Sequence, residues 1–135
     1  MQRASILFRT LTGGGWECLD QTYGENDRME LVARRAGGDA QPIRIAGPGL
    51  SEGTRDQLYL ALRLAYLESY AERSPAPPFI GDDLFASFDE ARTMQGLRTL
   101  AALSPKVQPI IFTHHRHVAD LALAELGDAA DILLL

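Results

Sequence analysis

Two short apolar segments, joined by a segment with helical spacing, constrain the fold of this chain more than any other feature. Residues 79–81 and 109–113 read as strands, and each is followed directly by acidic or imidazole side chains. Between them, Glu90–Leu103 places apolar residues on one helical face, with Asp89 positioned as the N-cap. A strand, a helix and a strand in succession predict a right-handed crossover and a parallel sheet. We therefore expect the reactive side chains to meet at the carboxyl edge of that sheet.

The first third of the chain is predicted to be rich in β-structure. Strand-like runs occur at residues 16–20, 28–33 and 43–46, separated by turns that contain glycine. Short consecutive strands of this kind are typical of an antiparallel meander. The pattern changes at the Gly-Pro-Gly sequence of residues 47–49. We expect a single domain that combines a β-rich meander at 1–49 with an α/β lobe at 50–135.

The α/β lobe is predicted to begin with the longest helix of the chain. Apolar residues recur at helical spacing after Ser51, and prolines from Pro75 onward end the helix. The strand at 109–113 is apolar throughout, which is typical of strands buried on both faces of a parallel sheet. A further helix at 116–125 leads to an expected last strand at 132–135. The fold class is therefore α/β.

Composition excludes several classes of protein. The chain has 135 residues, of which 46% are apolar and 23% charged, and this suits one globular domain. Its longest apolar runs are far shorter than the roughly 20 residues that cross a bilayer, so no membrane partner is expected. The net charge of -5 offers no basic face for nucleic acid. The single cysteine, Cys18, and the lack of a signal-peptide pattern indicate a cytoplasmic location.

The side chains that follow the two strands have complementary chemistry. Asp82 and Asp83 follow the first strand, and His114 and His115 follow the second. One of two adjacent carboxylates can hold hydrated Mg²⁺ while the other accepts a proton from an attacking water. A nearby imidazole can donate a hydrogen bond to a phosphate. An isolated Asp-Asp pair more often lies in a solvated loop. The functional interpretation of this pair therefore depends on its position directly after a strand.

A second group of residues precedes the long helix. Ser51, Glu52, Gly53, Thr54 and Arg55 combine a hydroxyl, a glycine, unpaired helix amides and a positive charge. Such a helix start can receive an anion such as a γ-phosphate. The same serine is also a good N-cap, so the motif alone leaves both roles open.

Taken in order, these motifs resemble those of the ATP-binding-cassette (ABC) ATPases. Residues 50–57 resemble the signature motif, 79–83 the Walker B motif, 87–89 the D-loop and 111–114 the switch-histidine strand. The chain is similar to the C-terminal lobe of an ABC-type ATPase head, as in chromosome-segregation (SMC), RecF, RecN and YhaN-like proteins. The resemblance covers about the whole chain and implies a P-loop NTPase-like fold.

The resemblance implies roles for the residues at the strand ends. Asp82 would hold Mg²⁺ through water, Asp83 would polarise the attacking water, and His114 would contact the γ-phosphate. His115 competes with His114 for this role. The sequence departs from the family at Asp83, where Glu is usual, and at Gly81, where a bulky apolar residue is usual.

The resemblance also implies a partner. The family's heads pair and enclose ATP, so Ser51 and Gly53 would contact the γ-phosphate of a nucleotide held by a second copy. Asp89 would link the two active sites across that homodimer. Glu52 and Thr54 stand where many relatives have Gly and Gln. The cofactors implied are ATP and Mg²⁺, and DNA is an implied partner of the full-length protein.

A P-loop is missing from the sequence. This phosphate-binding motif needs Gly-x-x-x-x-Gly-Lys followed by Ser or Thr. The only lysine, Lys106, follows Pro105 and lacks that context. We therefore expect that the chain is a fragment or a split product, that it is inactive alone, and that the Walker A motif lies in an N-terminal lobe.

Three functions remain open from the sequence. The first is the signature and Walker B part of an SMC-like ATPase that hydrolyses ATP between two heads, with DNA repair or chromosome maintenance as the implied process. The second is a metal-dependent hydrolase that uses a cluster of Asp82, Asp83 and His114, with His115 and His117 nearby. The third is a non-catalytic ATPase-like dimerisation module.

Overall fold

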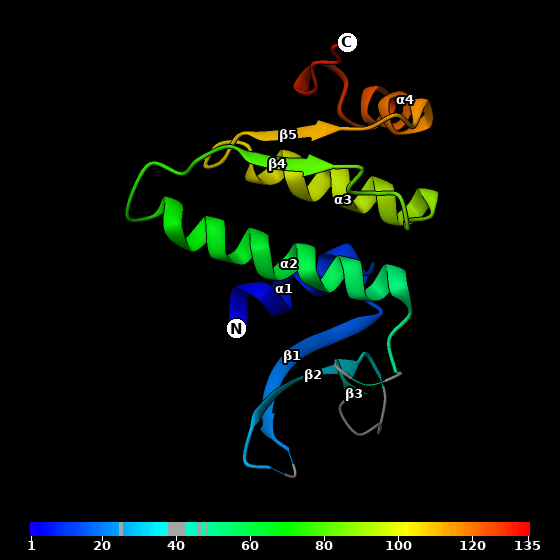
Figure 1. Ribbon diagram of the computed structural model, residues 1–135. Coiled ribbons are helices and arrows are strands. Elements are labelled where there is room, and N and C mark those ends of the chain that lie inside the picture. The colour runs from blue at the N-terminus through cyan, green and yellow to red at the C-terminus, as the bar shows by residue number, and fades with distance from the viewer. Residues whose placement is uncertain (25, 38–42, 46, 48) are drawn as a thin grey trace. The chain divides into compact units, whose positions relative to one another are not determined.

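The computed structural model describes residues 1–24, 26–37, 43–45, 47 and 49–135 (Figure 1). These residues form two compact units, Met1–Ala65 and Tyr66–Leu135. No helix in the described ranges is both long enough and apolar enough to cross a membrane. Two sequence expectations fall partly outside these ranges, namely the end of the third strand at Ala46 and the middle of the boundary at Pro48.

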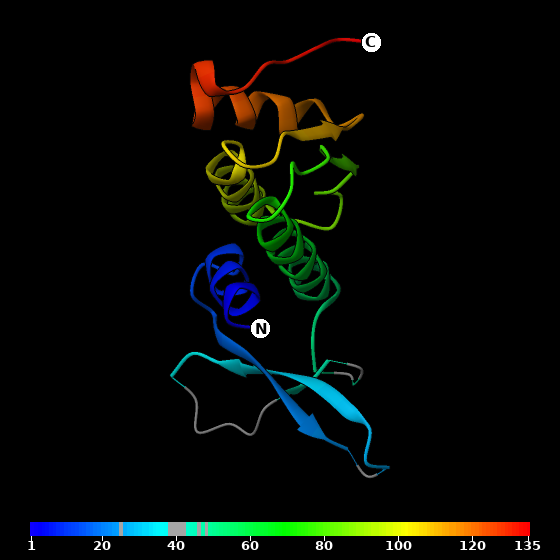
Figure 2. The ribbon, with the colours of Figure 1, turned by 90° about the vertical axis from the view of Figure 1, so that its left-hand side faces the viewer.

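The first unit contains the predicted antiparallel meander. Its sheet has the order β1 (Trp16–Tyr23), β2 (Met29–Arg35) and β3 (Ile43–Arg44), and both pairings are antiparallel. A bulge interrupts the start of the first pairing between Trp16 and Cys18, which increases local twist. The twisted ribbon of β1 and β2 is plain in Figure 2. The meander prediction is confirmed for these strands.

A helix that the sequence analysis does not assign precedes the meander. Residues Gln2–Leu11 form α1. Ala4, Phe8 and Leu11 recur at helical spacing and are buried, so they provide the apolar face that holds this helix in place. Two glycines with positive φ, Gly13 at 61° and Gly14 at 84°, follow the helix and let the chain turn into β1.

The long helix predicted after Ser51 is α2 (Glu52–Ala71). Its first half supplies the core of the first unit with Leu58, Ala61 and Leu64, each fully buried. Gln57 is buried beside them, and its side-chain amide donates a hydrogen bond to the carbonyl of Leu11. This bond satisfies a carbonyl at the end of α1 that the helix itself leaves unpaired.

The second unit contains the predicted parallel strands. Strands β4 (Phe79–Asp82) and β5 (Pro109–Phe112) pair in parallel, and their arrows point the same way in Figure 1. Helix α3 (Glu90–Leu103) connects them, and α4 (Arg116–Leu126) follows β5. The register joins Asp82 to Phe112, so both strands end at the same edge. The βαβ prediction is confirmed.

One prediction about the sheet is wrong, because β5 is not buried on both faces. Its residues are half-buried or exposed, and Phe112 is 44% exposed. In β4, Phe79 and Gly81 are buried, whereas Ile80 is 63% exposed. Burial on both faces requires a layer on each side. Within the described residues of this unit, the sheet is covered on one side only.

The last predicted strand is also wrong. Residues Gly127–Ala129 form a short 3-10 helix, and residues 132–135 have no regular secondary structure. Leu134 is 96% exposed. A strand needs a neighbour to satisfy its backbone groups. In the part of the chain that the structure describes, no strand pairs with this apolar tail.

Helix α3, which lies between the two strands in sequence, is held in place by its N-cap and by a close contact with a phenylalanine ring. The side chain of Asp89 accepts a hydrogen bond from the backbone of Arg92 at 2.8 Å, so Asp89 is the predicted N-cap of α3. Further along, the ring of the buried Phe85 packs against Gly96. A Cβ at Gly96 would overlap that ring.

We expect Gly96→Ala to destabilise the chain by about 1–3 kcal/mol, because the buried Phe85 ring has to move. At the exposed position Ala102, also in α3, the reverse substitution measures helix propensity without a contact to Phe85. Ala102→Gly should lower the free energy of unfolding by at most about 1 kcal/mol. Urea unfolding measures both. A more stable Gly96→Ala variant would show that helix propensity outweighs the contact with Phe85.

Candidate functional site

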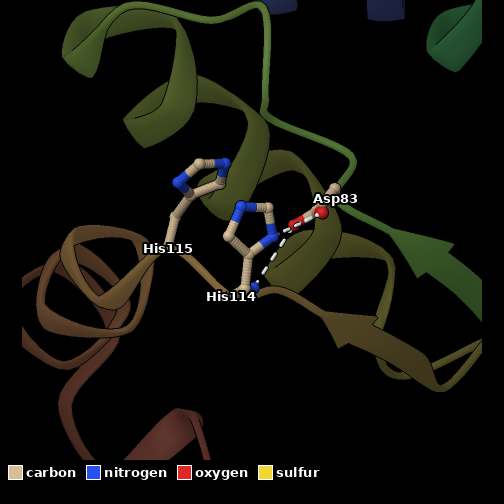
Figure 3. Close-up of side chains that lie close together, drawn as sticks. All are labelled: Asp83, His114 and His115. Atoms are coloured by element: carbon tan, nitrogen blue, oxygen red, sulfur yellow. Dashed lines mark hydrogen bonds and ion pairs between the residues drawn. The ribbon is translucent and has the colours of Figure 1, made fainter.

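The parallel pairing brings Asp83 and His114 together at the carboxyl edge of the sheet (Figure 3). Asp83 directly follows β4, and His114 comes two residues after β5. The Nδ1 atom of His114 lies 2.7 Å from Oδ2 of Asp83. The backbone N–H of His114 donates to Oδ1 of Asp83 at 3.3 Å. Both carboxylate oxygens are therefore engaged by one residue from the neighbouring strand end.

The backbone of Asp83 is bent into the left-handed region. Its φ is 45°, and its N–H donates to the carbonyl of Phe112 at 2.8 Å. Aspartate tolerates this conformation better than residues with longer or branched side chains do. The bend turns the short side chain toward His114, so position 83 combines an unusual backbone with an acid shorter than the Glu that is usual in the resembling family.

Hydrogen bonds keep Asp83 ionised. Partial burial raises the pKa of its carboxyl group, but this effect is outweighed by the hydroxyl of Thr113, by the backbone and ring of His114, and by the charge of His114. The net result is a pKa below the usual range for aspartate. At neutral pH the group is therefore a carboxylate whose position is fixed by donors from β5 and its continuation.

Three imidazoles lie in a row beside this carboxylate. The ring centroids of His114 and His115 are 3.9 Å apart, and those of His115 and His117 are 5.6 Å apart. Asp83, His114 and His115 each offer one ligand atom within 4.8 Å of the others. The expected convergence at the strand ends is therefore observed for these three residues.

Asp82 lies at the same edge but outside this cluster. It is exposed on the face of β4 that also exposes Ile80. Its carboxylate is a hard oxygen ligand, and Mg²⁺ in proteins is commonly held by one or two carboxylates together with substrate phosphates. An exposed carboxylate at this edge therefore suits Mg²⁺.

Gly81 is explained by its neighbours. A Cβ at this position would lie 2.9 Å from Cδ1 of Ile111 and 3.3 Å from the side chain of Leu84. Ile111 in the neighbouring strand and Leu84 after β4 therefore occupy the space that a side chain at position 81 would need.

The signature-like residues lie in the first unit, and the structure shows their role as a helix start. The Oγ atom of Ser51 accepts the N–H of Thr54 at 3.3 Å and forms a hydrogen bond with the hydroxyl of Thr54 at 2.8 Å. Thr54 is only 7% exposed, and Gly53 is buried. Ser51 and Glu52 remain exposed. Only part of the motif is therefore accessible to a ligand.

The two remaining predicted ligand residues also have structural partners. Arg55 is half-buried, and its Nη2 donates to the carbonyl of Gly47 at 3.4 Å. Asp89 is exposed, and besides capping α3 it lies 3.5 Å from Nε of Arg92. Each of these residues contributes to local order whatever else it binds.

Sequence reasoning missed Thr113. Its hydroxyl bonds to the carboxylate of Asp83 and also accepts the N–H of His115 at 3.1 Å. It thus joins the acid to the second histidine. The available signal was a hydroxyl residue at the end of the expected strand 109–113, directly before a pair of histidines.

Comparisons with known proteins give a consistent result. No family model matches the chain. The uncharacterised protein YhaN of Bacillus subtilis is 34% identical over 121 residues, which are 89% of this chain and 12% of that protein. A solved chain from a study of ATP-driven dimerization and DNA-stimulated activation of SMC ATPases aligns with a TM-score of 0.67 and 23% identity, over 93% of this chain and 71% of that one. The chain has the fold of part of an SMC head.

Other SMC heads agree with this assignment. The Pyrococcus furiosus Smc head, bound to the C-terminal domain of ScpA, aligns with a TM-score of 0.64 and 23% identity, over 92% of this chain and 29% of that one. The Thermotoga maritima SMC head gives 0.58 and 23%, over 90% and 41%. The predicted resemblance to an SMC-like ATPase head and the predicted α/β fold are confirmed. The chain spans about one eighth of the YhaN protein that it matches.

The lowered pKa of Asp83 predicts how the site responds to acid. The stabilisation that this carboxylate provides is complete above its unfolded pKa of about 3.9 and is lost as the pH falls through its lower folded value. Carboxyl ¹³C NMR should show Asp83 titrating below the usual range. Thr113→Val should move that titration upward, because it removes one donor. Thr10→Val, a matched change on α1, should leave it unchanged, and an equal effect of both variants would contradict this assignment.

Proposed function

We propose that this chain is the signature and Walker B part of an SMC-like ATPase that hydrolyses ATP between two heads. The observation that carries the proposal is the hydrogen-bonded pair of Asp83 and His114 at the carboxyl edge of two parallel strands. Ligands of open α/β sheets bind at this edge. The SMC head fold supports nucleotide as that ligand.

The pair supplies complementary functions for phosphoryl transfer. Positioning and electrostatic stabilisation dominate that reaction, so a carboxylate that orients water need not be a strong base. Asp83 is ionised and fixed, which suits it to polarise an attacking water. When His114 is protonated, its Nδ1–H donates to Asp83 and its Nε2–H is free to donate to a γ-phosphate oxygen. His115, stacked on His114, limits the movement of that ring.

Asp82 is proposed to hold Mg²⁺ through water. The ion would neutralise charge on the phosphates as the terminal phosphoryl group is transferred. Exposure of Asp82 at the edge leaves room for the waters that Mg²⁺ usually retains. The roles of the two adjacent aspartates therefore differ, since Asp83 is held by His114 whereas Asp82 is turned to the exposed face.

A second head is the proposed partner. The exposed Ser51 and Glu52 and the half-buried Arg55 are the signature residues that can face a nucleotide held by another copy. Asp89, exposed at the start of α3, is the proposed link between the two sites. ATP-driven dimerization is described for the SMC ATPases with which the chain shares its fold. DNA contact in the full-length protein would need surfaces other than those of this acidic chain. We place the protein in the cytoplasm.

The chain by itself should not bind ATP appreciably, because none of its 135 residues forms a P-loop. The proposed partner lobe supplies the Walker A motif. Calorimetry of the isolated chain with Mg²⁺ and ATP should therefore show no binding in the micromolar range. Micromolar affinity would contradict the division of the site between two lobes.

We expect Asp83→Asn to reduce ATP turnover by at least about 100-fold once the chain is combined with the lobe that carries the P-loop. Asparagine keeps the size and tolerates the left-handed backbone, so the change removes mainly the charge. Asp128→Asn, an exposed acid beyond α4, is the matched control and should leave turnover unchanged. Equal turnover in the two variants would remove Asp83 from the mechanism.

A further inference from the structure

One imidazole at the strand edge has no role in the proposed hydrolysis beyond restraining its neighbour. His115 is half-buried at the N-cap position of α4, yet its side chain makes no capping hydrogen bond there. Its ring instead stacks on His114. Together with Asp83, these two histidines present three ligand atoms within 4.8 Å of one another.

The donor set has a definite metal preference. Two imidazole nitrogens and one carboxylate oxygen suit Zn²⁺ and its first-row neighbours, whereas Mg²⁺ and Ca²⁺ prefer oxygen ligands. The geometry points to a site at which Asp83, His114 and His115 bind one divalent transition-metal ion of the Zn²⁺ class. This site differs from the proposed Mg²⁺ position, because Asp82 is not one of the clustered ligands.

The distances fit with small movements of side chains. Zinc–nitrogen bonds of about 2.0–2.1 Å place ligand atoms of a tetrahedral site roughly 3.3 Å apart. The 2.7 Å contact between Asp83 and His114 would open slightly, and His115 would move inward. The side chain of His114 is 73% exposed, so its ring can shift slightly while it stays in contact with His115. Three protein ligands leave the fourth position open to water or an anion.

The surrounding hydrogen bonds orient the ligands. Oδ1 of Asp83 accepts the backbone N–H of His114, and Oδ2 lies against the ring of His114. The hydroxyl of Thr113 bonds to Asp83 and fixes the backbone of His115. Hydrogen bonds of this kind to metal ligands commonly raise metal affinity 10–100-fold. The cluster therefore has both the ligands and the supporting contacts of a metal site.

A bound ion would occupy the two groups that the proposed ATPase uses, Asp83 and His114. If the proposed function holds, metals of the Zn²⁺ class would oppose ATP turnover, whereas Mg²⁺ would support it. Metal binding itself does not depend on that function, since it requires neither nucleotide nor a partner lobe. The two proposals can therefore fail separately.

The test uses the 135-residue chain without nucleotide. Titration with Co²⁺, followed by visible absorption, should saturate at one ion per chain with the intensity typical of low coordination number, and calorimetry with Zn²⁺ should give the same stoichiometry. A large excess of Mg²⁺ should not displace Co²⁺, because nitrogen ligands disfavour it. Absence of micromolar binding, or displacement by Mg²⁺, would overturn the proposal.

Variants locate the ion. His115→Gln should weaken Co²⁺ binding at least about tenfold. His117→Gln is the matched control, because His117 belongs to the same row of rings but lies outside the cluster, and it should change affinity by less than about twofold. Circular dichroism checks that both variants fold, and His115→Asn replaces His115→Gln if the latter does not. A larger loss with His117→Gln than with the variant at 115 would place the metal elsewhere and overturn the assignment.

Discussion

The parallel pairing of β4 with β5 is the constraint on which the candidate site depends. Its register ends both strands at one edge, and the N–H of Asp83 continues the pairing by donating to Phe112. Because of this one contact, residues 31 positions apart in sequence share a hydrogen bond between carboxylate and imidazole. A shift of one residue in that register would turn the strand's side chains to opposite faces and separate the pair.

The sequence predicts those parts of the fold that depend on local patterns. The helix start at Asp89, the parallel strands and the antiparallel meander follow from capping, apolar spacing and turn residues. The open face of β5 and the unpaired tail at 132–135 do not follow, because burial depends on layers that no local pattern specifies. The helix at Gln2–Leu11 was missed for a different reason. It has only 10 residues and buries only Ala4, Phe8 and Leu11, so its helical period is short and weak.

At the candidate site, likewise, the chemistry could be predicted from the sequence, whereas part of the geometry could not. The residue types at 82–83 and 114–115 indicated metal and phosphate chemistry, and the strand order indicated that they would meet. The separation of Asp82 from the cluster and the bridging hydroxyl of Thr113 required the backbone itself. For the residues around Ser51, the helix cap and the ligand role share one hydroxyl, so sequence alone could not distinguish them.

The left-handed backbone at position 83 limits how this site can change. Glutamate carries one more methylene and would pay about 1–2 kcal/mol for the same backbone angle, whereas aspartate, asparagine and glycine tolerate it more easily. Substitution by the acid usual in the resembling proteins would therefore lower stability by about that amount, unless the backbone after β4 relaxed. The bend at position 83 accordingly favours the shorter acid over the longer one.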